Sequence, residues 1–301
     1  CFDVVTLQLI VHPVPVATIP ADYELCDNGA DDTDGIATFD LTTVEAEVLG
    51  TLDPALYSVA FYGTFAAAEL GLTPIATPSS YNSTTDTIHV RVTNNATGCY
   101  DIVPLELIVN PLPVVNNPLP YTLCDENNPG DEVEIFDLTT QYSLIAVDPN
   151  GVNITFHHSF DDATTGADPV TNPETYENQA TVETLFARVT TEVTGCYRIV
   201  LLDVRVEPLP VLYLDNIDDE LTVGCDEDGD GFTVFNLEAM IEAMINGGVN
   251  LEVTFHETAL DAESGFNPIV NTTSYQNAVA LFDEIYVRVV NTVTGCVNSE
   301  V

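Results

Sequence analysis

The tripeptide Thr-Gly-Cys recurs three times at nearly constant spacing, and this repeat limits the possible folds more than any other feature. It occurs at Thr97-Gly98-Cys99, Thr194-Gly195-Cys196 and Thr294-Gly295-Cys296, and Cys1-Phe2-Asp3 reads like Cys99-Tyr100-Asp101. A second cysteine recurs with a similar period at Cys26, Cys124 and Cys225. A fixed period of this length is typical of an array of similar domains. The chain is therefore expected to contain three tandem domains.

The phase of the repeat sets the expected domain boundaries. A proline pair opens each unit, at Pro13-Val14-Pro15, Pro111-Leu112-Pro113 and Pro208-Leu209-Pro210. The sequence predicts repeats at 13–110, 111–207 and 208–301, with the last strand of the third repeat incomplete. Residues 1–12 are predicted to be the last strand of a preceding repeat. We therefore expect this sequence to be a window on a longer repeat protein.

Short segments of alternating apolar and polar residues predict about seven strands in each repeat. The most regular example is Ile88-His89-Val90-Arg91-Val92, and a short helical turn is expected after each Phe-Asp-Leu or Phe-Asn-Leu strand. Tyr81, Tyr176 and Tyr275 precede the most regular strand of each repeat, as in a tyrosine corner. These features predict an all-β fold: a tandem array of immunoglobulin-like β-sandwich domains, each with one short helical turn.

The charge of the chain excludes several classes of partner. The chain has 48 acidic residues against five arginines and no lysine, which gives a net charge of −43. Almost no side chain could neutralise phosphates, so nucleic acid is excluded. An anionic membrane surface would repel the chain, and no apolar run is long enough for a membrane helix. Regular cysteines in such a chain predict disulfides and an oxidising, extracellular location.

The cysteines admit two pairing schemes. The favoured scheme pairs cysteines within each repeat, because one cysteine ends the first strand and the other starts the last strand. Its pairs are Cys26–Cys99, Cys124–Cys196 and Cys225–Cys296, with the partner of Cys1 outside the sequence. The alternative crosses each joint, with the pairs Cys1–Cys26, Cys99–Cys124 and Cys196–Cys225.

An acidic, glycine-containing loop follows the first cysteine of each repeat. Carboxylates two positions apart around glycine can wrap an oxygen-seeking cation, so calcium is the expected cofactor. An EF-hand is excluded, because Leu237 stands at the twelfth position counted from Asp226. The alternative is a solvated turn, in which aspartate and glycine are also favoured. The candidate ligands are Asp226, Asp228 and Asp230 in the third repeat, Asp27, Asp32 and Asp34 in the first, and Asp125 and Asp131 in the second.

Arginine recurs at one repeat position inside an apolar strand, at Arg91, Arg188 and Arg288. Among so many acids each of these arginines is expected to form a structural ion pair. The expected partner is the acid of the Phe-Asp-Leu strand, Asp40 or Asp137, a position where the third repeat has Asn236. An anion-binding role is the less favoured interpretation.

No catalytic arrangement is predicted. His157, His158 and His256 lie near acids, but their spacing matches no common metal site. The sequence contains no nucleophile elbow, phosphate-binding loop or dinucleotide fingerprint. The chain is therefore not expected to be an enzyme.

The succession Leu-Cys-Asp, Phe-Asp-Leu-Thr, Val-Arg-Val, Thr-Gly-Cys and Pro-Leu-Pro-Val resembles the immunoglobulin-like tandem repeats of very large secreted surface proteins of gliding flavobacteria. The resemblance covers all three repeats; the third departs from it at Gly224 and Asn236. It implies an exported adhesin or surface filament that uses type IX secretion. No catalytic residue is implied.

These observations favour a structural or adhesive stalk at the cell surface, which bound calcium would stiffen and whose partners are the neighbouring repeats of the same chain. One alternative is a fibre of short chains joined by strand exchange, in which other copies are the partners. A second is an array of glycan- or protein-binding modules, and a third is the accessory region of a secreted enzyme. The surface ligand is not predicted by the sequence.

Overall fold

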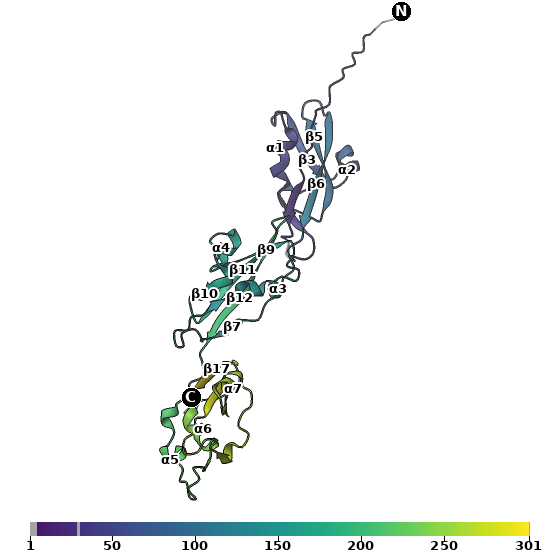
Figure 1. Cartoon of the computed structure of the whole chain (residues 1–301). Coiled ribbons are helices and arrows are strands. Elements are labelled where there is room, and N and C mark those ends of the chain that lie inside the picture. The colour runs from purple at the N-terminus through teal and green to yellow at the C-terminus, as the bar shows by residue number, and fades with distance from the viewer. Residues whose placement is uncertain (1–4, 29–30, 301) are drawn as a thin grey trace, which may run out of the picture. The chain divides into compact units, whose positions relative to one another are not determined.

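The computed structural model describes residues 5–28 and 31–300 (Figure 1). The chain divides into two compact units. The first extends to residue 116 and includes 145–155 and 188–200; the second contains 117–144, 156–187 and the residues from 201 onward. The second repeat therefore contributes segments to both units.

The first repeat is a small sandwich of one four-stranded and one two-stranded sheet. The strand order is β1-β6-β5-β3 in the larger sheet, and β2 pairs with β4 in the smaller one. Neighbours in the larger sheet are antiparallel, except that β1 runs parallel to β6. The elements are β1 (Tyr23–Cys26), β2 (Ala37–Phe39), η1 (Leu41–Val44), α1 (Glu45–Leu49), β3 (Tyr57–Tyr62), α2 (Phe65–Leu70), η2 (Pro78–Ser80), β4 (Tyr81–Ser83), β5 (Asp86–Asn94) and β6 (Tyr100–Asn110).

The second repeat has the same arrangement. Its larger sheet has the order β7-β12-β11-β9, with β7 parallel to β12, and its smaller sheet pairs β8 with β10. The elements are β7 (Tyr121–Cys124), β8 (Ile135–Phe136), η3 (Leu138–Gln141), α3 (Tyr142–Ile145), β9 (Val152–His157), α4 (Phe160–Thr165), η4 (Pro173–Thr175), β10 (Tyr176–Glu177), β11 (Val182–Thr191) and β12 (Tyr197–Glu207).

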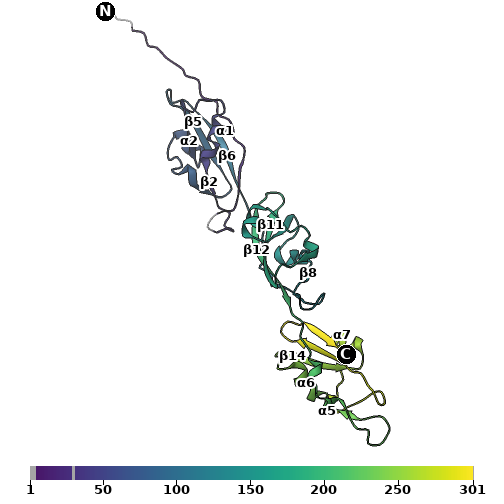
Figure 2. The same ribbon diagram turned by 90° about the vertical axis from the view of Figure 1, so that its left-hand side faces the viewer.

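The third repeat has a smaller sheet system. Its main sheet has only three strands in the order β14-β16-β17, and β13 pairs with β15. The elements are η5 (Leu214–Asn216), α5 (Asp219–Thr222), β13 (Val234–Phe235), α6 (Glu238–Ile245), β14 (Leu251–His256), α7 (Ala259–Ser264), η6 (Thr272–Ser274), β15 (Tyr275–Gln276), β16 (Tyr286–Asn291) and β17 (Val297–Glu300), labelled in part in Figures 1 and 2.

Alternation along the strands builds the core. In β5, Ile88, Val90 and Val92 are fully buried, whereas the intervening His89 and Arg91 are only half-buried. The buried residues pack with Phe39 and other apolar side chains contributed by β2, α1, β3 and β6. Arg91 therefore lies on the face of the sheet opposite the core, where α2 packs against the strands.

A second short helix in each repeat was not predicted by the sequence. It occurs as α2, α4 and α7, and each begins at a capping hydroxyl: Thr64, Ser159 or Thr258 accepts a hydrogen bond from the third backbone N–H of the helix. Each ends at a glycine in the left-handed conformation. Each repeat therefore has more helical segments than the single turn that was predicted.

The prediction of an all-β array of immunoglobulin-like sandwiches is confirmed, because most elements are strands in sheets. Residues 5–12 form no strand in the structure, and their assignment to a preceding repeat stays a prediction. In the third repeat the segment before Cys225 is not a strand as it is in the first two, and Leu221 and Thr222 form the end of α5. No helix among the described residues has the length and apolar character needed to cross a membrane.

Candidate functional site

The Thr-Gly-Cys sequence forms a tight turn that starts the last strand of each repeat. In the first repeat the Thr97 hydroxyl accepts a hydrogen bond from the N–H of Cys99 at 3.3 Å, and Gly98 has φ of +74°. The turns at Cys196 and Cys296 have the same contact, at 3.3 and 3.2 Å. Threonine supplies the acceptor and glycine the left-handed conformation, so the turn fixes where the cysteine enters the strand.

The other cysteine of the first and second repeats lies at the opposite end of the sheet. The parallel register of β1 and β6 sets Cys26 beside Asn110, the last residue of β6. The register of β7 and β12 likewise sets Cys124 beside Glu207. Eleven residues of extended chain cover about 36 Å, so the two cysteines of one repeat are far apart.

Two disulfides therefore connect different repeats. Cys26 is bonded to Cys196 and Cys124 to Cys296, each pair with a Cα–Cα distance of 5.6 Å. The Sγ atom of Cys196 also lies 4.0 Å from the carbonyl oxygen of Asn110, and that of Cys296 lies 3.9 Å from the carbonyl oxygen of Glu207. Each bond joins the first cysteine of one repeat to the Thr-Gly-Cys cysteine of the next.

Both predicted pairing schemes are wrong. The within-repeat scheme needs the first strand to run antiparallel to the last, so that the end of one meets the start of the other. The strands are parallel instead, and a disulfide needs Cα atoms within about 7 Å. The alternative scheme crossed the joints but joined Cys99 to Cys124 and Cys196 to Cys225, which the observed bonds also exclude.

Two other predicted disulfide cysteines, Cys99 and Cys225, form no disulfide with a described residue. Cys99 is half-buried and Cys225 is exposed. Cys1 lies outside the described residues.

An ion pair accompanies the first disulfide. Arg198, two residues after Cys196, has its Nη2 atom 2.8 Å from Oδ1 of Asp32 and donates to the Asp32 carbonyl oxygen at 3.0 Å. Asp32, which was predicted to be a calcium ligand, thus contacts the second repeat. In the first and third repeats the residue two positions after the Thr-Gly-Cys cysteine bonds to the backbone near the start of its own repeat. Asp101 accepts a hydrogen bond from the N–H of Ala17, and the Asn298 amide donates to the carbonyl oxygen of Pro210. The scarcity of arginine was the available signal for this contact.

The repeated arginines cap helices, which was not predicted. Nη1 of Arg91 donates to the carbonyls of Ala68 and Glu69 at the end of α2, at 2.7 and 3.1 Å. Arg288 does the same at the end of α7, with the carbonyls of Ala262 and Glu263. Positive charge at a helix C-terminus interacts favourably with the unpaired carbonyls. Gly71 has φ of +66°, a left-handed conformation that other residues rarely adopt, so glycine is favoured at the end of this helix.

The predicted ion pair between Arg91 and Asp40 is therefore wrong, because Arg91 binds helix carbonyls. Asp40 and Asp137 instead cap η1 and η3, where each carboxylate accepts hydrogen bonds from the threonine two residues later. The guanidinium groups of Arg91 and Arg188 also lie over the rings of Tyr100 and Tyr197, at 3.7 and 3.4 Å from the ring centres. Arg91 thus holds both a helix end and an aromatic ring against the outer face of the sheet.

The first aspartate of each acidic loop holds the loop closed. Asp27 accepts a hydrogen bond from the N–H of Gly35 and Asp125 one from Gly130, and both aspartates are buried. Asp226 accepts from Gly231 and Gly229, and these two bonds keep its pKa below the ordinary value. The Oδ1 atoms of Asp27 and Asp125 are buried without a hydrogen-bond partner.

Only the third loop gathers its predicted ligands, among the residues that the structure describes. Carboxylate oxygens of Asp226, Asp228 and Asp230 lie within 4.8 Å of one another, and all three residues are exposed. In the other loops Asp34 accepts from the N–H of Ile36, and Asp131 accepts from Val133 and Asn128. The described parts of those loops thus spread their carboxylates over separate turns.

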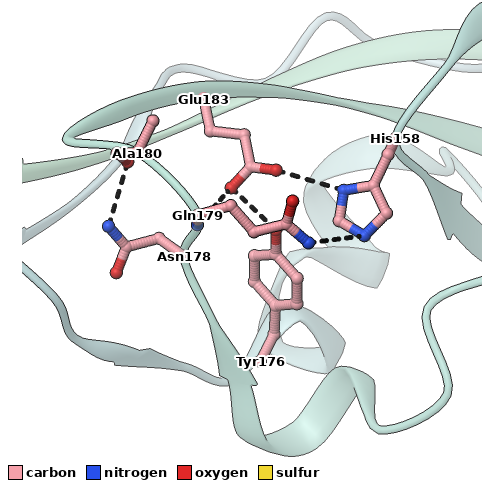
Figure 3. Close-up of polar contacts among 6 residues, drawn as sticks. All are labelled: His158, Tyr176, Asn178, Gln179, Ala180 and Glu183. Atoms are coloured by element: carbon pink, nitrogen blue, oxygen red, sulfur yellow. Dashed lines mark hydrogen bonds and ion pairs between the residues drawn. The ribbon is translucent and has the colours of Figure 1, made fainter.

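A cluster of polar side chains in the second repeat joins the predicted tyrosine corner to a histidine (Figure 3). One carboxylate oxygen of Glu183 lies 3.1 Å from Nδ1 of His158, and the other accepts from the hydroxyl of Tyr176 at 2.7 Å. Burial, together with this bond to Glu183, raises the pKa of Tyr176. In the third repeat Tyr275 donates to Asp283 in the same way. The recurrence of the tyrosine–carboxylate pair indicates a structural role.

The other two histidines considered in the sequence are core residues. His157 and His256 are fully buried, and their Nδ1 atoms lie 2.7 and 2.8 Å from the carbonyl oxygens of Ala167 and Phe266. These bonds tie the strand that contains the histidine to the loop after the short helix. Neither histidine is accessible to a substrate.

Comparison with known proteins places the repeats in a family. The family model described as the Flavobacterium inter-domain disulphide bond domain matches residues 22–113, 120–210 and 221–301. No curated protein matches the chain.

Solved structures show only a distant likeness. A three-immunoglobulin-domain structure of titin is 9% identical, with a TM-score of 0.28 and 94% coverage of both chains. A four-domain fragment of Drosophila N-cadherin is 14% identical with a TM-score of 0.19, covering 93% of this chain and 71% of that chain. Sidekick-1 immunoglobulin domains are 9% identical with a TM-score of 0.22, covering 94% and 59%.

Removal of the first inter-repeat bond should lower the resistance of the chain to denaturant. The change is Cys26→Ala with Cys196→Ala, in a background in which Cys1, Cys99 and Cys225 are serine. The bond closes a loop of 170 residues, which the chain-entropy model values at roughly 5 kcal/mol. Urea unfolding followed by circular dichroism should show a lower midpoint than the background alone. An unchanged midpoint would mean that the bond does not constrain the unfolded chain.

Arg91→Met should destabilise the first repeat by about 1–2 kcal/mol, because two carbonyls at the end of α2 lose a charged donor. The matched control is Arg205→Met, which removes only an ion pair of 3.4 Å between Arg205 and Glu207. Thermal unfolding should show a lower Tm for the first variant and little change for the second. Equal shifts would contradict the capping role.

Proposed function

The chain belongs to the Flavobacterium inter-domain disulphide bond domain family, and we propose that it is a segment of an extracellular structural stalk that keeps its repeats joined under tension. The single observation that carries this proposal is the pattern of the two disulfides. Each bond leaves one repeat and enters the next, so the second repeat is bonded to both of its neighbours. A binding module or an enzyme domain has no need of such continuity.

The bonds change how force would pass along the chain. The shortest covalent path between the ends runs to Cys26, crosses to Cys196, returns to Cys124 and crosses to Cys296. This path contains only about a third of the residues. Most of the chain is bypassed, so an unfolded repeat could lengthen only a little before the bonds became taut.

The oxidised bonds support an extracellular location. Structural disulfides persist outside the cytosol, where thiols are not kept reduced. The net charge of −43 fits an exposed stalk, because like charges keep neighbouring stalks apart and soluble. From the resemblance to the repeats of flavobacterial surface proteins we further propose a place at the cell surface, export by type IX secretion and an adhesive or gliding-related role for the parent protein.

We also propose that the chain is not an enzyme. Among the described residues, His157 and His256 are enclosed in the core, and Glu183 is occupied by Tyr176 and His158. The titratable groups that lie close together hold strands, loops and helix ends. This distribution favours a structural role over catalysis.

Calcium stiffening is a second candidate function, favoured by the acidic loop of the third repeat. Asp226, Asp228 and Asp230 offer three carboxylates within 4.8 Å, and Ca²⁺ takes six to eight oxygen ligands from flexible, exposed loops. Asp226 would hold the loop closed through Gly229 and Gly231 while its remaining lone pairs face the ion. A bound ion would neutralise charge and stiffen the loop.

The stalk proposal predicts a large effect of reductant on extensibility. A single molecule with Cys1, Cys99 and Cys225 replaced by serine is held at its two ends and pulled to full unfolding. With both bonds intact, its extension should stop at roughly 350 Å, whereas the reduced chain should reach roughly 1,000 Å at about 3.4 Å per residue. Equal extensions before and after reduction would show that the bonds carry no tension.

The calcium proposal predicts binding that depends on the third loop. Isothermal titration with CaCl₂ should detect a site, with an affinity in the millimolar to sub-millimolar range of extracellular modules, that Asp228→Asn with Asp230→Asn abolishes. The control Asp215→Asn with Asp219→Asn removes the same charge from exposed positions of the same repeat. If both double variants bind calcium as the unmodified chain does, this loop is not the site.

A further inference from the structure

The four bonded cysteines do not pair in the order in which they occur in the chain. Cys26 and Cys196 are 170 residues apart, and Cys124 lies between them. Cys124 and Cys296 are 172 residues apart, and Cys196 lies between them. The two closed loops therefore overlap. A chain oxidised as it lengthened would instead join neighbours in sequence, so the observed pairs need another source of selectivity.

Chain entropy does not supply this selectivity. The cost of closing a loop rises with its length as (3/2)RT ln n, so the closest cysteines, Cys124 and Cys196, are favoured in an unfolded chain. Among four cysteines the first bond also fixes the second. Weighted by the closure cost, random pairing would give the two observed bonds in only about one fifth of unfolded chains. The selection must therefore come from folded structure.

One backbone carbonyl brings the two cysteines of each bond together. The carbonyl oxygen of Asn110 accepts a hydrogen bond from the N–H of Asp27 at 2.9 Å and lies 4.0 Å from Sγ of Cys196. Asp27 directly follows Cys26, so this oxygen positions both partners. The carbonyl oxygen of Glu207 has the same two contacts at the second bond, at 2.9 and 3.9 Å.

This arrangement exists only in folded repeats. Asn110 is the last residue of β6, and Cys26 reaches it through the parallel pairing of β1 with β6. Cys196 is placed by the turn between the paired strands β11 and β12, where the N–H of Thr191 donates to its carbonyl at 2.8 Å. The sheet of the first repeat and this hairpin of the second must therefore form before the two sulfur atoms can meet.

An ion pair holds the first joint independently of its disulfide. Arg198, two residues after Cys196, lies 2.8 Å from a carboxylate oxygen of Asp32 in the first repeat. It supplies attraction where the net charge of −43 would otherwise oppose the approach of the repeats. The same position in the third repeat is Asn298, whose amide binds Pro210 of its own repeat. Arg198 is thus a positioning residue for the first bond, and the second bond offers an internal control.

Burial protects the observed bonds once they exist. Cys196 and Cys296 are fully buried, and their partners Cys26 and Cys124 are half-buried. Thiol–disulfide exchange requires access of the attacking thiolate to a sulfur atom. A bond between unfolded segments has no such cover and stays open to exchange. Repeated exchange should therefore accumulate the observed pairs.

We propose that folding selects the cysteine pairs: two consecutive repeats assemble with reduced thiols, and an external disulfide then oxidises the assembled joint. The reaction that must supply the mature array is thiol–disulfide exchange on folded repeats. Bonds formed earlier between neighbours in sequence are intermediates that the same reaction rearranges. This inference goes beyond the stalk function, because it concerns how the array is made.

The covalent step balances with a small-molecule or protein disulfide as the oxidant. The thiolate of Cys26 attacks one sulfur of the oxidant and displaces the other as a thiolate. The thiolate of Cys196 then attacks the Cys26 sulfur of the mixed disulfide and displaces the second. Two protein thiols are oxidised and one disulfide is reduced to two thiols. A rearrangement needs no oxidant, because one disulfide breaks for each that forms.

The test uses the full chain with Cys1, Cys99 and Cys225 replaced by serine, which leaves the four cysteines of the observed bonds. The reduced chain is treated with oxidised glutathione either in native buffer or in concentrated urea. A protease that cleaves at acidic residues, which are plentiful here, releases peptides for disulfide mapping by mass spectrometry.

We expect the observed pairs in nearly all chains oxidised in native buffer and in about one fifth of those oxidised in urea. The urea sample, returned to native buffer with a little reduced glutathione, should convert to the observed pairs. Circular dichroism of the reduced chain in native buffer should already show the β-sheet signal, because the fold is expected to precede the bonds.

Arg198→Met tests whether the first joint assembles before its bond forms. In native buffer the rate of Cys26–Cys196 formation should fall about two- to fivefold relative to that of Cys124–Cys296 in the same molecule. Asp32→Asn should have the same effect. Added salt should remove the difference between variant and unmodified chain, because it screens the ion pair. A general loss of folding would slow both bonds alike.

Three results would overturn the proposal. A reduced chain without sheet structure would mean that the bonds form before the repeats fold. Oxidation in native buffer that gives the pairs in the proportions of the urea sample would mean that folding does not select them. An unchanged ratio of the two rates in Arg198→Met would mean that the joint is not assembled before oxidation. None of these results bears on the stalk proposal, whose force measurement starts from completed bonds.

Discussion

The parallel pairing of the first strand with the last strand in the first and second repeats is the constraint on which the cysteine network depends. It carries the first cysteine to the end of the sheet where the chain leaves the repeat, beside Asn110 or Glu207. The Thr-Gly-Cys turn of the following repeat contacts the same residue. A disulfide between repeats is then the only bond within reach, because the partner in the same repeat lies about 36 Å away.

The sequence predicted the repeats, the sheets and the positions of the cysteines, but not their pairing. Periodicity and alternation report on the face that a residue occupies, and these signals were sufficient for Ile88, Val90 and Val92. Neither signal reveals whether a short edge strand runs parallel or antiparallel to its neighbour. Tyr23–Cys26 alternates in the same way whether it runs parallel or antiparallel to β6. The pairing of Cys26 depends on that direction alone.

The charged residues show a similar limit. A lone arginine in an acidic chain suggests a carboxylate partner, yet Arg91 and Arg288 bind helix carbonyls. The helices that supply those carbonyls have only six residues each, and their start at a hydroxyl and end at a glycine are weak signals in a threonine-rich sequence. Arg198, which has no equivalent arginine in the other repeats, binds an acid of the neighbouring repeat, a contact that was not predicted from the sequence.

The joints also show why a covalent bond is used. The ion pair of Arg198 with Asp32 is partly exposed, and such pairs contribute about 0–1 kcal/mol and weaken as salt is added. A chain with a net charge of −43 further opposes close contact between its own repeats. A disulfide is insensitive to both salt and charge. The disulfides therefore hold together repeats that would otherwise repel one another, and the large acidic excess is compatible with a continuous array.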